Sequence, residues 1–325
     1  MKIKKYYFLL LYILYLVSCD ESAQQPLPQE SSATITITSP EYKYYTINPA
    51  LTYSTTNASS VDIKLNSNPI TINNGEQITD LITGFNDIEI TVTDNNGISK
   101  TESIVFFINK LILNESDNFN RADNTEIGWT TEYGTSFYPI VSDDYLQIKN
   151  NNLVLYGSNQ ISSEGAGGGI IKPYDPITDF EIIQKIKVNY ISQFNWATAT
   201  LKISNDQFFI VSELMLYKDG GQFRTALKMY ERYSNVDYPI AFSNNPDFDF
   251  NNGIQLLFYR KHNSCYCILI DSTDDILNVI STKDYAIHEN IATYNSREIN
   301  MWYSIDGVDN SSEIIVNIDD YEFYR

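Results

Sequence analysis

The chain has 325 residues and a formal net charge of −19 at neutral pH. A chain of this length is expected to hold two domains, each large enough to bury a core of its own. The negative charge repels nucleic acid and anionic lipid headgroups, which argues against both as partners. The 25 tyrosines and the abundant Ile and Thr favour β-strands.

The first residues have the pattern of an export signal. Lys2, Lys4 and Lys5 give a positive start, and Tyr6–Val17 is an uncharged, largely apolar run. A positive start, a short apolar run and small residues before a cleavage point describe a secretory signal. A helix over this run would reach about 18 Å, well short of the ~30 Å hydrocarbon core of a bilayer. The alternative is a buried apolar helix that happens to precede a cysteine.

The apolar run closes with Leu16-Val17-Ser18-Cys19, which resembles the lipobox of bacterial lipoproteins. The resemblance covers residues 1–19 and implies that Cys19 becomes the acylated first residue of the mature protein, carrying fatty acyl chains such as palmitate. We therefore expect a lipid anchor in the bacterial cell envelope, at the outer membrane or cell surface rather than the inner membrane. Loss of the three signal lysines would change the net charge from −19 to −22.

Residues 20–33 are polar, contain prolines and have no hydrophobic periodicity. Such a composition is typical of a flexible linker. We expect this segment to lift the folded part of the chain away from the lipid.

Residues 34–110 show short alternating runs separated by turn signals. Alternation begins at Thr34–Thr38, and Asn, Asp and Gly clusters such as Asp94–Gly97 interrupt the later runs. About seven short strands without a helix pattern predict a small sandwich. The stretch Gly84–Gly97 resembles the closing hairpin of bacterial immunoglobulin-like domains. That resemblance implies a spacer or adhesive module, and nothing in it suggests catalysis.

Residues 111–325 continue the β pattern with longer strands, which suits one large two-sheet sandwich. Ala197, Ala199 and Leu201 alternate with polar neighbours, for example. The segment 223–230 fits helical spacing as well as strand spacing. We interpret it as a strand because the neighbouring segments are all strands.

Both ends of this second region carry further family signals. Asp117–Asp123 followed by Gly128-Trp129 resembles the opening of concanavalin A-like (laminin-G-like) jelly-roll domains, and Ile314–Tyr324 resembles their final strand. The resemblance implies an all-β chain: a small immunoglobulin-like sandwich over 34–110 followed by a larger concanavalin A-like jelly roll over 111–325. It also implies that the first and last strands of the jelly roll pair.

That fold is shared by lectins, carbohydrate-binding modules and glucan hydrolases, so it does not decide function. Hydrolases of the laminarinase type carry Glu-x-Asp-x-x-Glu, which places carboxylates side by side for a retaining mechanism. Here Glu115-Ser116-Asp117 is the sole Glu-x-Asp, and Asn120 stands where the second glutamate should be. Other acids such as Glu213 are isolated, and we expect them to be solvated. The residues favour binding over catalysis.

A structural calcium ion is the one cofactor that the sequence suggests, and none is required. In the concanavalin-like resemblance, calcium often sits where the last strand meets the first. Asp320 matches that place, with Asp117 as a co-ligand. The alternative is a surface turn with solvated aspartates. The acidic run Asp247–Gly253 lacks the glycine and glutamate that an EF-hand loop needs, so it is interpreted as a turn.

Cys265 and Cys267 lie two residues apart in an apolar run, Cys265–Ile270, that is interpreted as a strand. Residues two apart on a strand share a face, so both thiols are expected in the core. A disulfide across one intervening residue is the alternative, although such a bridge would be strained.

Sugar binding needs aromatic rings to stack on sugar C–H groups and polar groups to bond the hydroxyls. Side chains alternate between the two sides of a strand, so the residues next to buried apolar ones point outward. Four aromatic or cationic residues are expected on such an outward face: Trp196, Arg224, Lys228 and Tyr230. Lys185 and Lys187 are likewise expected on an outward face. A cationic, aromatic face suits an anionic glycan or an acidic peptide. Trp196 could instead pack under a loop, while Trp129 and Trp302 are expected in the core.

These patterns predict a lipid-anchored envelope protein that presents its second domain to a glycan or to a protein on a host surface. A diverged glycan hydrolase and a purely structural envelope protein are the alternatives. The absence of a paired-carboxylate motif favours binding.

Overall fold

The structure is a computed structural model that describes residues 32–122, 130–132, 146–158, 166–177, 181–190, 196–205, 208–219, 222–233, 236–245, 253–261, 264–281, 294–304 and 313–325. Cys19 and the residues before 32 lie outside the described part, as do Trp129 and the run 246–252. The regular elements of the described part are β-strands, so the expected all-β class is confirmed. In those same residues there is no helix with the length and apolar character needed to cross a membrane.

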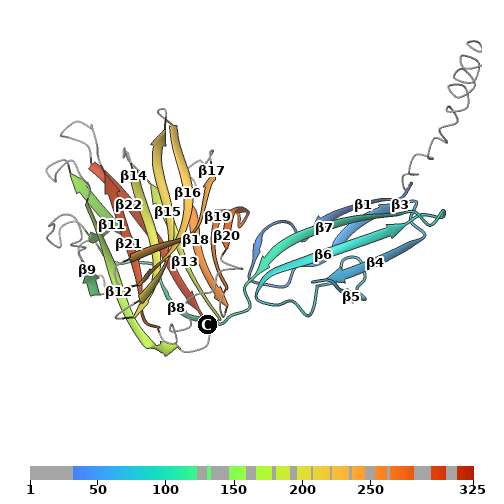
Figure 1. Cartoon of the computed structure of the whole chain (residues 1–325), viewed down its shortest axis with the longest axis horizontal. Helices are drawn as coiled ribbons and strands as arrows, with labels where there is room; N and C mark the ends of the chain where they lie inside the picture. The colour runs from blue at the N-terminus through green and yellow to red at the C-terminus, as the bar shows by residue number, and fades with distance from the viewer. Residues whose placement is uncertain are drawn as a thin grey trace, which may run out of the picture.

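Residues 32–109 form the N-terminal unit, which is built from two sheets (Figure 1). Strand β1 pairs with β3, and a second sheet has the order β2-β7-β6-β4-β5. The strands are β1 (Thr34–Ser39), β2 (Tyr44–Tyr45), β3 (Thr52–Thr56), β4 (Ser60–Leu65), β5 (Asn68–Ile70), β6 (Gly84–Thr93) and β7 (Ser99–Ile108). The alternation in β6 puts Ile88, Ile90 and Val92 inside, where they are fully buried between the sheets.

Two tight turns set the register of this unit. Asn66 and Ser67 connect β4 to β5 and have φ values of 50° and 68°, the two positive angles that a type I′ hairpin turn needs. At the β6–β7 turn, the Asp94 carboxylate accepts hydrogen bonds from the backbone N–H groups of Asn96 (2.8 Å) and Ile98 (3.0 Å). The other oxygen of Asp94 accepts from the Ser32 N–H at 3.0 Å. The first described residue is therefore fixed to the tip of this hairpin.

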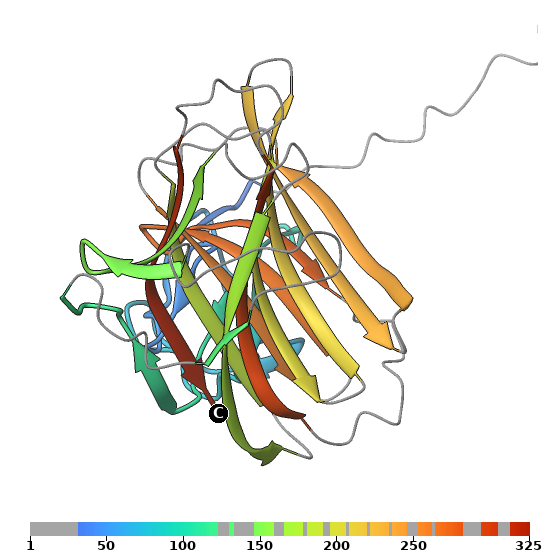
Figure 2. The same ribbon diagram turned by 90° about the vertical axis from the view of Figure 1, so that its left-hand side faces the viewer.

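Residues 110–325 form the C-terminal unit, in which two large sheets face each other (Figures 1 and 2). The eight-stranded sheet has the order β10-β11-β22-β13-β18-β19-β20, with β8 also paired to β22; the seven-stranded sheet has the order β17-β16-β15-β14-β21-β12-β9. The strands are β8 (Leu113–Asp117), β9 (Thr130–Glu132), β10 (Leu146–Lys149), β11 (Asn152–Ser158), β12 (Ala166–Ile177), β13 (Glu181–Tyr190), β14 (Trp196–Asn205), β15 (Phe208–Asp219), β16 (Gln222–Tyr233), β17 (Val236–Asn245), β18 (Ile254–Lys261), β19 (Ser264–Asp271), β20 (Ile276–Ser281), β21 (Tyr294–Ser304) and β22 (Glu313–Tyr324). The ambiguous segment 223–230 lies in β16, so the strand interpretation is confirmed.

The core of the C-terminal unit lies between these two sheets. Leu256 and Phe258 of β18 are fully buried, and so are Leu201 of β14 and Leu227 of β16. Cys265 and Cys267 are free thiols on the core face of β19. Burial raises the pKa of the Cys267 thiol to about 12. The expectation of buried core cysteines is confirmed, and the structure contains no disulfide between them.

The first and last strands of the C-terminal unit pair, as the resemblance implied. In the β8–β22 register, Tyr321 lies opposite Asp117. Glu115 of β8 forms ion pairs with Arg297 and Lys172, and the Arg297 side chain is almost fully buried. The Arg297 guanidinium also lies 4.6 Å from the centroid of the Phe323 ring. Glu115, the glutamate of the Glu-x-Asp sequence, thus has a structural role inside the sandwich.

The two units share a hydrophobic cluster, the junction cluster. It joins Tyr44 and Phe107 of the N-terminal unit to residues on the outer face of the eight-stranded sheet: Ile183, Leu257, Tyr259, Ile268, Ile270, Ile276 and Tyr324. Phe107 is fully buried and meets Tyr259 edge-on at a centroid distance of 5.2 Å. The alternation in the two regions predicts separate sandwiches with separate cores. The N-terminal unit does have a separate core, but Tyr44 and Phe107 complete their burial against the other unit.

Polar contacts accompany the junction cluster. The Tyr44 N–H donates to the Asp274 carbonyl at 2.9 Å, and the Ile276 N–H donates to the Tyr42 carbonyl at 3.3 Å. The Lys43 ammonium lies 3.3 Å from the Asp275 carboxylate. Backbone pairing thus continues from β2 of one unit to the β19–β20 turn of the other.

Candidate functional site

The seven-stranded sheet has one face in the core and one face turned away from the eight-stranded sheet. On β16, the side chains of Thr225, Leu227 and Met229 are fully buried in the core. The residues between them lie on the opposite, outer face, where Arg224, Lys228 and Tyr230 are partly exposed. The N-terminal unit packs on the other, eight-stranded sheet.

Three neighbouring strands place aromatic and cationic residues in one row across the outer face. Trp196 of β14 lies opposite Tyr217 of β15, which lies opposite Arg224 of β16. We call these three residues the aromatic row. The side chain of Trp196 is outside the described part, so its place comes from the strand register. The register puts Trp196, Arg224, Lys228 and Tyr230 on one face, in agreement with the alternation in the sequence, while their role in binding stays a prediction.

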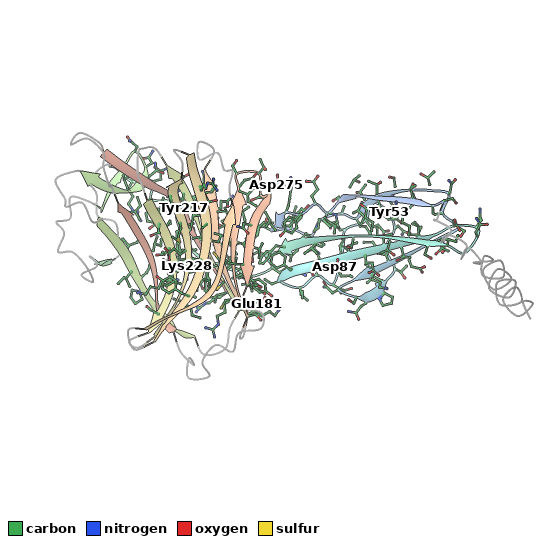
Figure 3. The ribbon with its side chains drawn as sticks, turned by 45° about the horizontal axis from the view of Figure 1, so that its top comes forward. Tyr53, Asp87, Glu181, Tyr217, Lys228 and Asp275 are labelled. Carbon is green, nitrogen blue, oxygen red and sulfur yellow. The ribbon has the colours of Figure 1, made fainter. Side chains whose placement is uncertain are left out.

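A second, polar row crosses the middle of the same face. Thr200 of β14 lies opposite Glu213 of β15, which lies opposite Lys228 of β16. We call these three residues the polar row. The Lys228 ammonium is 3.8 Å from the Glu213 carboxylate and 4.7 Å from the centroid of the Tyr230 ring. Figure 3 shows Lys228 and Tyr217 in the C-terminal unit, away from the strands that meet the N-terminal unit.

Glu213 is the site residue that the sequence interpretation missed. Glu213 is only 6% exposed, and its neighbour Thr200 is only 5% exposed. The expectation of a solvated glutamate is therefore wrong. Because Ser212 and Leu214 point into the core, alternation along β15 places Glu213 on the outer face of the sheet. The register between strands sets Thr200 and Lys228 beside it.

The surroundings of Glu213 decide what chemistry it can support. The nearest positions on the same face are Val211 and Met215 along β15, and Thr200 and Lys228 on the adjacent strands. None of these four is acidic. A retaining glycosidase needs two carboxyl groups about 5–5.5 Å apart. The described residues next to Glu213 do not supply the second one.

Strands β21 and β12 extend the outer face on its other side. Trp302 of β21 lies opposite Thr198 of β14 and opposite Gly167 of β12. Thr198 alternates with the core residue Ala199, so the register places Trp302 on the outer face. The side chain of Trp302 lies outside the described part, so its expected burial stays a prediction. Gly167 adds no side chain beside this position.

Lys185 and Lys187 belong to a different surface. Both lie on β13 of the eight-stranded sheet. The Lys185 ammonium is 2.6 Å from the Glu322 carboxylate, and Lys187 pairs with Asp319. Lys187 is partly exposed, whereas the Lys185 side chain is only 14% exposed and lies over the Tyr44 ring of the N-terminal unit. Both are on the other sheet from Arg224 and Lys228 and have acidic partners.

The structure does not bring the predicted calcium ligands together. Asp117 lies opposite Tyr321, which is buried in the core. Asp320 is the next residue to Tyr321 along β22, so it points to the other face of the sheet.

The Asp117 carboxylate already has hydrogen-bond partners. It accepts from the Phe119 N–H (2.9 Å) and from the Arg121 guanidinium (2.6 Å). Burial raises the pKa of Asp320, and the neighbouring Asp319 adds to this effect. Across the described residues, no group of three or more His, Cys, Asp or Glu could hold a metal ion. The two carboxylates therefore lie on opposite faces of the sheet, while calcium binding itself stays a prediction.

Comparison with known proteins places the fold. No protein-family model matches the chain, and no curated protein sequence matches it. Among solved structures, the CBM2 module of the evolved Dit from Lactobacillus casei BL23 phage J-1 has 9% identity and a TM-score of 0.50, over 64% of this chain and 93% of that module. A β-1,3-glucanase from Mycobacterium marinum has 9% identity and a TM-score of 0.47, over 66% of this chain and all of the glucanase (100%). The Bacillus licheniformis β-glucanase has 11% identity and a TM-score of 0.43, over 65% and 97%.

The C-terminal unit is a concanavalin A-like jelly roll. At these identities the likeness shows the fold of the jelly roll and nothing of its ligand.

Proposed function

We propose that this protein binds a glycan through the outer face of its seven-stranded sheet and is held at a bacterial cell envelope by lipid on Cys19. The observation that carries the proposal is the aromatic row beside the polar row. Aromatic rings supply stacking surfaces for sugar C–H groups, and Thr200, Glu213 and Lys228 supply hydrogen-bonding groups for hydroxyls. The jelly-roll fold, which glycan-binding modules and hydrolases share, supports the proposal.

Glycan binding is tested with purified full-length protein on a glycan array. Tyr230→Ala and Trp196→Ala each remove a proposed stacking surface for sugar C–H groups and should weaken binding measurably. The melting temperature should change little. Tyr42→Ala, which truncates an exposed tyrosine in the N-terminal unit, is the matched control and should bind like the parent. A large fall in melting temperature with unchanged affinity would place Trp196 in a packing role and refute its role in binding.

The burial of Glu213 on this face favours one second candidate, a glycan hydrolase. The glycan that binds on the array is incubated with the protein and assayed for new reducing ends. Release of reducing ends would support hydrolysis, and Glu213→Gln should then abolish that release. If Glu213→Gln weakens binding and no product forms from the parent protein, the site binds without cleaving.

The anchor is tested separately. Cys19→Ala should leave an unlipidated precursor that is lost from the detergent phase of membrane fractions. Mass spectrometry of the native mature protein should find an acylated Cys19 at the N-terminus. An unmodified Cys19, or a mature chain that starts elsewhere, would refute this part of the proposal.

A further inference from the structure

The N-terminal unit contains a pocket of about 610 Å³ between the edges of its two sheets. Tyr53 of β3 lines the pocket from the two-stranded sheet, and residues of β4, β5 and the segment that follows β5 line it from the other sheet. The apolar part of the lining includes Ile63, Ile70 and Ile72, which pack against the core of this unit. A volume of this size is in the range of ligand sites.

Strand β4 has an open backbone edge beside this pocket. The Asn66 N–H donates to the Asp87 carbonyl of the β6 side, so antiparallel alternation turns the N–H and C=O groups of Val61 and Ile63 away from β6. Ile63 lies opposite Ile70 of β5, and the pairing of β4 with β5 ends there. Val61 is 37% exposed, and its N–H and C=O have no hydrogen-bond partner in the described part of the chain.

The other sheet edge at the pocket is closed by a side chain. The Asn74 amide pairs with the backbone of Tyr53 as a neighbouring strand would: it accepts from the Tyr53 N–H at 3.0 Å and donates to the Tyr53 carbonyl at 2.8 Å. Val61 has no such partner among the residues that the structure describes. An unpaired edge beside apolar side chains can pair with another chain, and main-chain hydrogen bonds give the affinity in such strand addition.

Strand geometry determines which side chains an added strand would need. Val61 lies on the core face of β4 with Ile63, so a residue opposite Val61 points into the pocket and suits an apolar side chain. The next residue on either side points to the outer face, where Asp62 lies. Asp62 is exposed, and its carboxylate has no ion pair or hydrogen bond with a described residue. Lys64, on the same face, is paired with Glu89 at 2.6 Å.

The charge of the N-terminal unit favours a cationic partner. Residues 32–110 contain four lysines, no arginine and eight acidic residues, which gives a net charge of −4. Opposite charges on neighbouring strands stabilise their pairing, whereas like charges destabilise it. A lysine or arginine next to the apolar residue would therefore complement Asp62.

We propose that the edge of β4 at Val61 binds an extended, basic peptide segment of another protein. The segment adds to the sheet as a strand: its backbone pairs with the N–H and C=O of Val61, an apolar side chain enters the pocket, and a lysine or arginine lies beside Asp62. This site belongs to the N-terminal unit and is independent of the proposed glycan binding.

The test uses the full-length protein and the capped peptide Thr-Lys-Val-Lys-Thr. Titration calorimetry measures binding, and hydrogen exchange with mass spectrometry measures the protection of backbone amides in 59–63. The peptide should bind and slow exchange in this segment.

Matched peptides identify what is recognised. N-methylation of the central valine removes its N–H donor, Thr-Lys-Ser-Lys-Thr removes the apolar side chain, and Thr-Glu-Val-Glu-Thr reverses the charge. Each should bind about tenfold or more weakly, which corresponds to the loss of about 1.4 kcal/mol from one hydrogen bond or apolar contact.

Variants of the protein test the same contacts. Val61→Pro removes the N–H at a position where a strand edge tolerates proline, and it should abolish binding. Val61→Thr keeps the N–H and should still bind. Asp62→Asn should reduce the preference for the lysine peptide over the glutamate peptide, which also covers the case in which Val61→Pro folds poorly. Asp80→Asn makes the same charge change at another exposed position of this unit and should leave the preference unchanged.

The remaining outcomes overturn the proposal. Equal binding of the N-methylated peptide rules out strand addition, and equal binding of the glutamate peptide rules out the role of Asp62. Protection of 59–63 without peptide would mean that the edge is already occupied: by a second copy if dilution removes the protection, or by the chain's own N-terminal segment if deletion of residues 20–31 removes it. Absence of binding to every peptide refutes the site, and glycan binding would stand or fall separately.

Discussion

Gly84 faces the hydroxyl of Tyr259 so closely that a β-carbon at residue 84 would lie 2.9 Å from that oxygen. Gly84 begins β6 of the N-terminal unit with a φ of 104°, and Tyr259 comes from β18 of the C-terminal unit. The same hydroxyl lies 2.6 Å from the Glu181 carboxylate and 3.0 Å from the Thr83 carbonyl. The contact between the units therefore requires a residue without a side chain at position 84.

Gly84→Ala should destabilise the protein, because it adds a clash with Tyr259 to the cost of a positive φ. Gly97→Ala is the matched control: its φ is 79°, and nothing lies within 4 Å of the added carbon. The control should cost about 1–2 kcal/mol for the backbone angle alone. Urea denaturation should show a larger loss for Gly84→Ala, and equal losses would mean that Tyr259 moves aside freely.

Separating the units near Lys110 should harm the C-terminal fragment. The cut removes Tyr44 and Phe107 from the junction cluster and exposes apolar side chains such as Ile268 and Ile270 to water. Burying a large aliphatic side chain contributes about 1.5–3 kcal/mol, so the fragment 111–325 should melt at a lower temperature and aggregate more readily than the full chain. A fragment as stable and soluble as the parent would show that the junction cluster adds little.

Glu115→Gln should cost stability because it leaves Arg297 charged and almost fully buried. Breaking a buried pair by removing one partner typically costs about 3–5 kcal/mol. Glu89→Gln disrupts the more exposed pair between Lys64 and Glu89, whose atoms are 2.6 Å apart, and should cost less than about 1 kcal/mol. Chemical denaturation distinguishes the two, and glycan binding by the folded Glu115→Gln fraction should be unchanged.

Stability should depend on the ionisation of Asp94. Hydrogen bonds from the backbone of Ser32 and then Ile98 hold the pKa of Asp94 below its usual range. A carboxyl group whose pKa is depressed by folding contributes its stability above the unfolded value, about 3.9, and loses it as the pH falls through the folded value. Asp94→Ala should therefore lower the melting temperature at pH 7, and the deficit should shrink below about pH 4. Asp62→Ala, at an exposed position, should show no such pattern; a deficit for Asp94→Ala that is constant with pH would contradict this account.

The thiols of Cys265 and Cys267 should be unreactive in the folded protein. Both are fully buried, and the raised pKa of Cys267 leaves little thiolate at pH 8. Iodoacetamide should modify them only after denaturation, as measured by the mass of the peptide that contains both. Rapid alkylation under native conditions would indicate that the core opens locally.

Period-two alternation predicted the faces of single strands. It assigned Ile88, Ile90 and Val92 to the core, and it placed Arg224, Lys228 and Tyr230 together on the other side of their own strand from Leu227. This succeeds because the period of a strand is a property of the local backbone.

What depends on the alignment between strands could not be predicted. Asp117 and Asp320 come from strands far apart in sequence, and an offset of one residue decides whether their carboxylates share a face. Glu213 is buried between β14 and β16 in the sheet, and the register of these strands with β15 is set by the whole sandwich. The junction cluster could not be predicted, because the alternation in the strand of Phe107 does not indicate which unit its side chain packs against.

The junction cluster also determines how the molecule carries a mechanical load. Asp94 holds Ser32 at one end of β6, and Gly84 at the other end contacts Tyr259. A pull on Ser32 therefore enters β1 along the backbone and reaches the β6–β7 turn through Asp94. From that turn, β6 runs about 30 Å to the aromatic rings between the units. With Phe107 clamped between Tyr44 and Tyr259, the N-terminal unit acts as a stiff strut. A force on the C-terminal unit would be transmitted to the N-terminal unit through the rings of the junction cluster.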